Sequence, residues 1–325
     1  MNARIVFMFS GQGSQYAGMG HELYNRNLVF RRCMDEFSEV AFPLLGVYLS
    51  DKICSSTESE SDLLVQTRYT NPALYMFNYA VAATLESSGV IPDELLGYSL
   101  GELTAAAYNG NVDRFDLFVR LIRASFALEK HSPGGGMLAV LDSHQLWDRH
   151  PEWFGSTSLA SVNCSRSFVV SGPTNVLDEL QGRLQASSVL FQRLPVMQAF
   201  HSPWIDTAKP SVFREIDNIS LTARGRFPIY SCVAPGIVEE DSIGPRRFWD
   251  AMRQPVLFET TFRHIEAGGP RLYIDVGPSG TLAAFAKIAV GNASKSLALP
   301  VVDRFGLNER GLQNALVKAA AWRTS

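Results

Sequence analysis

Residues 94–110 read ELLGYSLGELTAAAYNG, and this stretch decides the fold class. Its first residues predict a short strand and its alanine-rich second half predicts a helix, so the chain contains a strand–turn–helix unit typical of α/β proteins. The turn, from Gly97 to Gly101, fits the pattern G-x-S-x-G, in which a tight turn lifts a serine above the edge of a sheet. Ser99 is therefore a candidate nucleophile, although a plain turn with a helix-capping serine would have the same sequence.

Further strands and helices are predicted on both sides of this unit. Residues 4–10, 227–231 and 271–276 are apolar and β-prone, and helical patterns lie between them, including one that opens at Asn71-Pro72 and ends at Gly89. The serine-rich and acidic segment 50–62 predicts a surface loop. This alternation of strands and helices predicts an α/β fold with a mainly parallel sheet.

The rhythm changes between residues 134 and 197. There the order of predicted elements is strand, helix, strand, strand, helix, strand, which is the ferredoxin-like βαββαβ arrangement. We therefore expect a core made of residues 1–133 and 198–325, with residues 134–197 inserted into it as a small subdomain.

The composition excludes several classes of protein. The 325 residues carry a net charge of −3, which gives no basic footprint for nucleic acid. The four cysteines are scattered without a C-x-x-C pair, so neither a zinc site nor a disulfide framework is expected. No apolar run approaches the length of a membrane helix or of a signal peptide. We expect a cytoplasmic protein without a metal or a tightly bound cofactor.

Two other short motifs carry candidate chemistry. GQGSQ at 11–15 follows the first strand but fits neither a dinucleotide loop, because Tyr16 stands where a third glycine belongs, nor a P-loop. It is either a tight turn or a source of an oxyanion-binding amide at Gln12. Among the six histidines, His201 in AFHSP is the favoured base, because the chain re-enters the core there. The residues alone leave this choice open.

Four motifs occur in order along the chain, namely GQGSQ at 11–15, GYSLGE at 97–102, AFHSP at 199–203 and DVGPSGTL at 275–282. Together they resemble the malonyl-CoA:acyl carrier protein transacylase family, which includes the acyltransferase domains of polyketide synthases. The resemblance spans residues 6–287. It implies an α/β-hydrolase-like core with an inserted ferredoxin-like subdomain. It also implies acyl-CoA and acyl carrier protein as partners in polyketide or fatty acid biosynthesis, with CoA or phosphopantetheine arriving only as part of the substrates.

The resemblance also assigns roles to single residues. Ser99 matches the nucleophile and His201 its base, with backbone carbonyls in residues 254–257 orienting the histidine in place of a carboxylate. The amides of Gln12 and Leu100 match the oxyanion-binding donors, and Asn163 matches an asparagine that lines the cleft.

Three further positions bear on the acyl group. Arg123 matches the arginine with which malonyl-using members bind the free carboxylate, provided that a one-residue gap is allowed; Arg120 is the alternative, and a plain surface arginine is another. Phe200 resembles the residue of malonyl-selecting members. Tyr98 departs from the family pattern, because GHSLGE is usual where this chain has GYSLGE.

Two activities remain compatible with this site. A malonyltransferase would pass the acyl group from Ser99 to a carrier protein thiol, whereas a proofreading hydrolase would pass it to water. The details of residues 7–16 and 277–285 are similar to discrete enzymes that accompany polyketide synthases, some of which resemble such hydrolases. An arginine at position 123 favours the transferase, and the intact Ser99 and His201 argue against a non-catalytic carrier-protein-binding module.

Overall fold

The structure, a computed structural model, describes residues 3–54, 63–222, 225–291 and 294–324. The strands of the described residues are β1 (Arg4–Phe9), β2 (Glu94–Gly97), β3 (Gly136–Val140), β4 (Ser158–Cys164), β5 (Ser167–Gly172), β6 (Phe191–Arg193), β7 (Ile229–Ser231), β8 (Gly236–Ile237), β9 (Arg271–Asp275) and β10 (Leu297–Pro300). The α-helices are α1 (His21–Arg26), α2 (Leu28–Leu45), α3 (Leu49–Cys54), α4 (Thr67–Ser87), α5 (Leu100–Tyr108), α6 (Arg114–His131), α7 (Gln145–Arg149), α8 (Pro151–Phe154), α9 (Thr174–Ala186), α10 (Lys209–Ile216), α11 (Pro245–Arg253), α12 (Phe258–Ala267), α13 (Thr281–Val290) and α14 (Glu309–Arg323).

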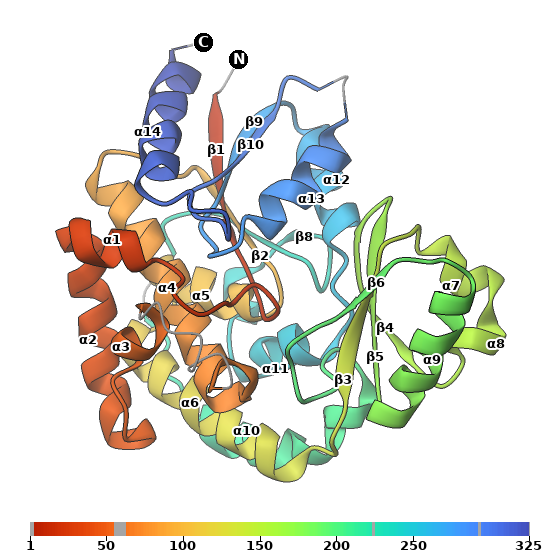
Figure 1. Ribbon diagram of the computed structural model, residues 1–325. Coiled ribbons are helices and arrows are strands. Elements are labelled where there is room, and N and C mark those ends of the chain that lie inside the picture. The colour runs from red at the N-terminus through yellow and green to blue at the C-terminus, as the bar shows by residue number, and fades with distance from the viewer. Residues whose placement is uncertain (1–2, 55–62, 223–224, 292–293, 325) are drawn as a thin grey trace.

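The larger sheet has the strand order β10-β9-β1-β2-β7-β8 and is parallel except for β8 at its edge. Helices cover both faces, which explains why β1 is a continuous apolar run rather than an alternating one. Its odd-numbered residues, such as Phe7, pack with α2, α4, α5 and α6, and its even-numbered residues, such as Met8, pack with α12 and α13. Figure 1 shows the sheet between these two helical layers.

The smaller sheet is antiparallel and has the order β4-β5-β3-β6. Its strands and helices, between Gly136 and Arg193, follow the predicted order of elements, with the first helix divided into α7 and α8. These helices and α9 cover one face of the sheet around a core of their own that includes Phe154 and Phe168. The unit lies beside the larger one as a separate layer, drawn in green in Figure 1.

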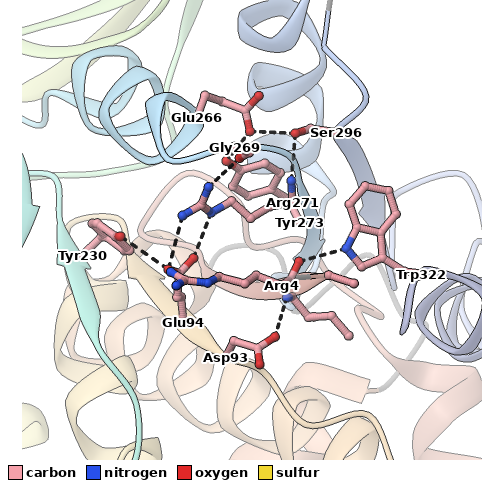
Figure 2. Close-up of polar contacts among 12 residues, drawn as sticks. Arg4, Asp93, Glu94, Tyr230, Glu266, Gly269, Arg271, Tyr273, Ser296 and Trp322 are labelled. Carbon is pink, nitrogen blue, oxygen red and sulfur yellow. Dashed lines mark hydrogen bonds and ion pairs between the residues drawn. The ribbon is translucent and has the colours of Figure 1, made fainter. Parts of the chain in front are cut away.

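A buried ionic network joins the strands at the end of the larger sheet where they begin (Figure 2). Glu94, at the start of β2, accepts hydrogen bonds from Arg4 of β1 at 2.5 Å and from Arg271 of β9 at 3.0 Å, and Tyr230 of β7 donates to it at 3.5 Å. Glu94 and Arg271 are both buried. The network therefore fixes four strands relative to one another at the end opposite to Ser99.

Two sequence predictions are wrong in detail. The first half of the predicted surface loop 50–62 belongs to α3, because Leu49 and Ile53 share one helical face and pack into the core; residues 55–62 lie outside the described part. Helix α4 begins at Thr67, before Pro72, because Glu129 of α6 accepts a hydrogen bond from the Arg68 amide and so caps its first turn. Strand β10 and helix α14 are not among the elements predicted from the sequence.

Candidate active site

Ser99 lies between the end of β2 and the start of α5, in a strained conformation with φ 54° and ψ −121°. Such angles cost a non-glycine residue energy and persist only where the surroundings enforce them. Ser99 stands at the N-cap position of α5, yet its side chain makes no capping hydrogen bond. Its Oγ lies 2.8 Å from Nε2 of His201 instead. The interpretation of Ser99 as a mere capping serine is therefore wrong.

Close packing around this turn requires glycine. A Cβ at Gly101 would lie 2.0 Å from the carbonyl oxygen of Phe9, and one at Gly11 would lie 3.1 Å from Cβ of Ser99. The GQGSQ turn after β1 thus packs directly against Ser99. The amides of Gly13 and Gly101 donate to Gln15 and to Tyr98. The amides of Gln12 and Leu100, which the resemblance implies as oxyanion donors, lie in these two turns and stay the candidates for holding a developing negative charge beside Ser99.

His201 is held from both its main chain and its ring. Its amide donates to the carbonyl of Met252 at 2.9 Å, and its Nδ1 lies 2.7 Å from the carbonyl oxygen of Gln254. Because a carbonyl only accepts, Nδ1 carries the proton and Nε2 is left to accept from the Ser99 hydroxyl. The residue itself has a left-handed backbone, with φ 59°. The carbonyl that orients His201 falls at the first residue of the predicted segment 254–257.

Burial keeps this histidine neutral. Desolvation lowers the pKa of His201 from 6.5 to about 4, the hydrogen bond to Gln254 opposes that shift, and the nearby charge of Arg253 adds to it. A neutral imidazole with a free Nε2 lone pair is the form that a general base requires. The pair of Ser99 and His201 is thus in the protonation state needed to activate a serine.

A cavity of about 230 Å³ lies between the two sheets, and Tyr98, the residue before Ser99, is part of its lining, whereas Ser99 and His201 are not. Gln12 and Tyr98 of the larger unit, Asn163 and Leu194 of the smaller unit, and Phe285 of α13 are among the residues that line it. The face of the smaller sheet that is not covered by its own helices forms one wall. The cavity is therefore a candidate substrate cleft whose two sides come from segments far apart in the sequence.

Tyr98 and Asn163 form a bridge across this cleft. The Tyr98 hydroxyl donates to Oδ1 of Asn163 at 2.8 Å, and Asn163 Nδ2 donates to Ser167 at 3.4 Å. Asn163 is buried, and Tyr98 is half-buried. Both predicted cleft residues thus line the cavity, and the tyrosine that departs from the family motif ties the larger unit to the smaller one.

The acyl transferase domain family model matches residues 6–322. The chain belongs to the acyl transferase domain family. It is 35% identical over 305 residues to the polyketide biosynthesis acyltransferase homolog PksD of Bacillus subtilis, covering 94% of this chain and 93% of that protein. Its fold is similar to the acyltransferase domain of the second module of the salinomycin polyketide synthase, with a TM-score of 0.84, 30% identity, and coverage of 98% and 73%. It is also similar in fold to the malonyl CoA-acyl carrier protein transacylase of Clostridium perfringens, with a TM-score of 0.81, 24% identity, and coverage of 99% and 98%.

The structure of this acyl transferase does not bring Arg123 to the site. Its side chain is exposed on α6, whereas the next two residues, Ala124 and Ser125, are buried. The alternative, Arg120, is engaged with Asp116 at 2.8 Å and with the carbonyl of Glu215 at 2.9 Å. Neither arginine lines the cavity. The structure therefore does not support a carboxylate-binding Arg123, because α6 exposes that side chain while it buries the next two positions.

Phe200 and a chain of buried polar side chains are the remaining features near the site. Phe200 is buried in the main core beside His201 and does not line the cavity. A polar chain that the sequence did not indicate runs from Gln12 Nε2 to Asn71 and from Asn71 Nδ2 to Ser125 at 2.9 Å. In the sequence, Asn71 predicts only the start of a helix. Ser125 falls on the buried face of α6, and a polar residue at such a position indicates a buried hydrogen bond.

The described residues contain no group of three or more histidine, cysteine, aspartate or glutamate side chains arranged to hold a metal ion. Nor does any helix in this part of the chain combine the length and apolarity needed to cross a bilayer.

Proposed function

We propose that this acyl transferase is a serine enzyme that takes an acyl group from a CoA thioester onto Ser99 and passes it to the phosphopantetheine thiol of an acyl carrier protein. The observation that supports this most is the contact of 2.8 Å between Ser99 Oγ and His201 Nε2, with Nδ1 of the same ring held by the Gln254 carbonyl. Membership of the family and the similarity to a polyketide acyltransferase homolog support the choice of substrates.

In the first half-reaction His201 takes the hydroxyl proton while Ser99 Oγ attacks the thioester carbonyl carbon. The carbonyl oxygen becomes negatively charged and is held by the amides of Gln12 and Leu100 at the start of α5. When the tetrahedral intermediate collapses, the C–S bond breaks, and the proton on His201 Nε2 goes to the departing thiolate. The products are an acyl ester of Ser99 and free CoA thiol.

The second half-reaction is the reverse with another thiol. His201 removes the proton from the phosphopantetheine thiol, and the sulfur attacks the Ser99 ester through the same oxyanion site. Ser99 leaves and recovers its proton from His201. Water in place of the thiol would give the hydrolase alternative, so the cleft must admit the arm and exclude water during the lifetime of the ester.

We further propose that the acyl group has no free carboxylate. Ser99 and His201 are buried, so a malonyl carboxylate beside them would lose its hydration and would need a cation. Through Gln12, the GQGSQ turn is linked to the neutral side chains of Asn71 and Ser125. Arg304 also contacts the turn, because its Nη2 donates to the carbonyls of Gly13 and Gln15 at 3.4 and 3.5 Å. Among the described residues that line the cavity, Arg304 is the one charged side chain, and it is exposed.

The experiment uses the full chain with acetyl-CoA or malonyl-CoA, followed by a carrier protein that bears phosphopantetheine. Intact-mass spectrometry follows the acyl group on the enzyme and then on the carrier. Ser99→Ala should abolish the adduct, whereas Ser187→Ala, at an exposed serine that caps the end of α9, should leave it unchanged.

Each product distribution leads to a separate conclusion. An acetyl ester on the enzyme that moves to the carrier, with little malonyl ester, supports both proposals. A malonyl ester of equal yield refutes the exclusion of the carboxylate and leaves the dyad intact. Free acid in place of acyl carrier protein identifies the hydrolase, and an adduct that persists in Ser99→Ala refutes the proposed nucleophile.

A further inference from the structure

The orientation of His201 depends on two backbone carbonyls that flank one residue, Arg253. The carbonyl of Met252 accepts from the His201 amide, and that of Gln254 accepts from its Nδ1. A carbonyl orients a ring only as well as its own chain segment is fixed. The placement of the base is therefore decided by what holds residues 252–254.

These residues form the end of α11, where a helix has carbonyls without helical partners and is prone to fray. Gln254 has already left the helix, with φ −82° and ψ 153°. On its far side, Val256 is anchored to β4, since its amide donates to Ala160 and its carbonyl accepts from Val162, both at 2.9 Å. On the near side, Met252 is packed into the main core, and a polar anchor comes from the helix end itself.

Arg253 supplies that anchor through Asp206. Its Nε lies 2.7 Å from Asp206 Oδ1 and its Nη2 lies 3.1 Å from Oδ2, so the pair is bidentate. Such forked pairs fix geometry better than a single contact does. The Arg253 side chain is 20% exposed and that of Asp206 is 47% exposed, so only the arginine side of the pair is shielded from water.

Asp206 lies on a short 3-10 helix (η3, Pro203–Ala208) that starts two residues after His201. Ser202 caps this helix by accepting from the Trp204 amide. The chain after His201 is thus tied back, through the ion pair, to the same segment whose carbonyls hold His201. This closed ring of contacts surrounds a residue in a left-handed conformation, which only persists when its neighbours enforce it.

We propose that the Asp206–Arg253 ion pair is a positioning element that keeps the carbonyls of Met252 and Gln254, and through them His201, in place for attack by Ser99. The inference rests on the proposed Ser99–His201 dyad. Neither partner lines the cavity between the two sheets, so we expect the pair to act on the placement of the base rather than on binding.

The test is a double-mutant cycle with Asp206→Asn, Arg253→Gln and the double variant, together with the conservative Arg253→Lys. The rate constant for acylation of Ser99 is measured at saturating acyl-CoA, alongside KM and the thermal unfolding midpoint. Arg263→Gln is the matched control, because it removes a similar ion pair, with Glu259 at 2.7 Å on α12, whose contacts do not include His201.

Each single variant should lower the acylation rate constant about ten- to a hundredfold with KM changed less than about twofold, because small misplacements of a catalytic group have effects of this size. The double variant should be no slower than the singles, since they remove the same contact, and Arg253→Lys should restore part of the rate. Acylation at the wild-type rate in Asp206→Asn or Arg253→Gln, or a double variant whose loss is the product of the two, would overturn the proposal. A Ser99→Ala variant that is still acylated would instead overturn the dyad.

Discussion

The pH dependence of Ser99 acylation is the sharpest test of the buried dyad, because burial moves the pKa of His201 far from its ordinary value. The shift from 6.5 to about 4 corresponds to about 3 kcal/mol in favour of the neutral ring. At pH 5.5 a histidine with a pKa of 6.5 is only about 9% neutral, whereas one with a pKa of about 4 is about 97% neutral. Acylation should therefore remain near its maximum at pH 5.5 and reach half-maximum near pH 4.

The assay must separate this effect from acid unfolding. The unfolded chain binds more protons than the folded one between pH 6.5 and about 4, so folding stability falls as the pH falls through this window. A stopped-flow jump from pH 7.5 into each assay buffer, with acylation followed by rapid quench and intact mass, measures the rate before slow unfolding. Ser99→Ala gives the background at each pH. Half-maximal acylation near pH 6.5 in a chain that circular dichroism shows to be folded would refute the reasoning.

Three substitutions test other parts of the structure. Gly101→Ala forces a methyl group to 2.0 Å from a β1 carbonyl, so it should lower the free energy of unfolding in urea by about 3 kcal/mol or more and abolish acylation. A stable, active variant would contradict the close packing of the turn at Ser99 against β1. Glu94→Gln leaves Arg271 buried without its counter-charge and should lower the free energy of unfolding by about 3 kcal/mol in the same measurement. A decrease below about 1 kcal/mol, the level of a surface ion pair, would show that the network is dispensable for stability. Tyr98→Phe keeps the ring but removes the donor to Asn163. We expect KM for the acyl thioester to rise about fivefold, corresponding to about 1 kcal/mol, with the acylation rate constant almost unchanged. A fall in that rate constant instead would mean that the phenol acts on the reacting atoms.

Of the proposed dyad, Ser99 could be predicted from the residues alone because its determinants are local, whereas His201 could not. The strand–turn–helix pattern around Ser99 specifies the elbow through short-range sterics, since Gly101 is the residue that lets α5 pass close to β1. His201 was one of six candidates on its residues alone, because its role depends on contacts with a segment about fifty residues away. The ordered motifs, rather than any one of them, selected it.

Arg123 shows that an alignment error of one residue changes which face of a helix a side chain occupies. Each residue advances an α-helix by about 100°, so a gap of one position moves a side chain from the core face to the solvent face. Position 123 is exposed while 124 and 125 are buried. The start of α4 was misplaced for a related reason, since Glu129, which caps it, is some sixty residues away and leaves no local trace in the sequence.

Within the part of the chain that the structure describes, no carboxylate lies next to His201. This absence affects both the pKa of the histidine and how firmly its ring is held. A carboxylate would stabilise the protonated ring and raise its pKa, whereas the Gln254 carbonyl fixes the tautomer with a weaker pull and leaves the pKa of the base at about 4. The base is then neutral and ready at any pH near 7, but it is a weak one, so the reaction depends on stabilising the oxyanion at the start of α5. It also depends on placement, because a neutral carbonyl on a helix end attracts the ring less strongly than a charge would. An enzyme that orients its histidine with a backbone carbonyl instead of a carboxylate must therefore fix the main chain that carries the carbonyl. The ion pair between Arg253 and Asp206 lies in that segment, next to Gln254.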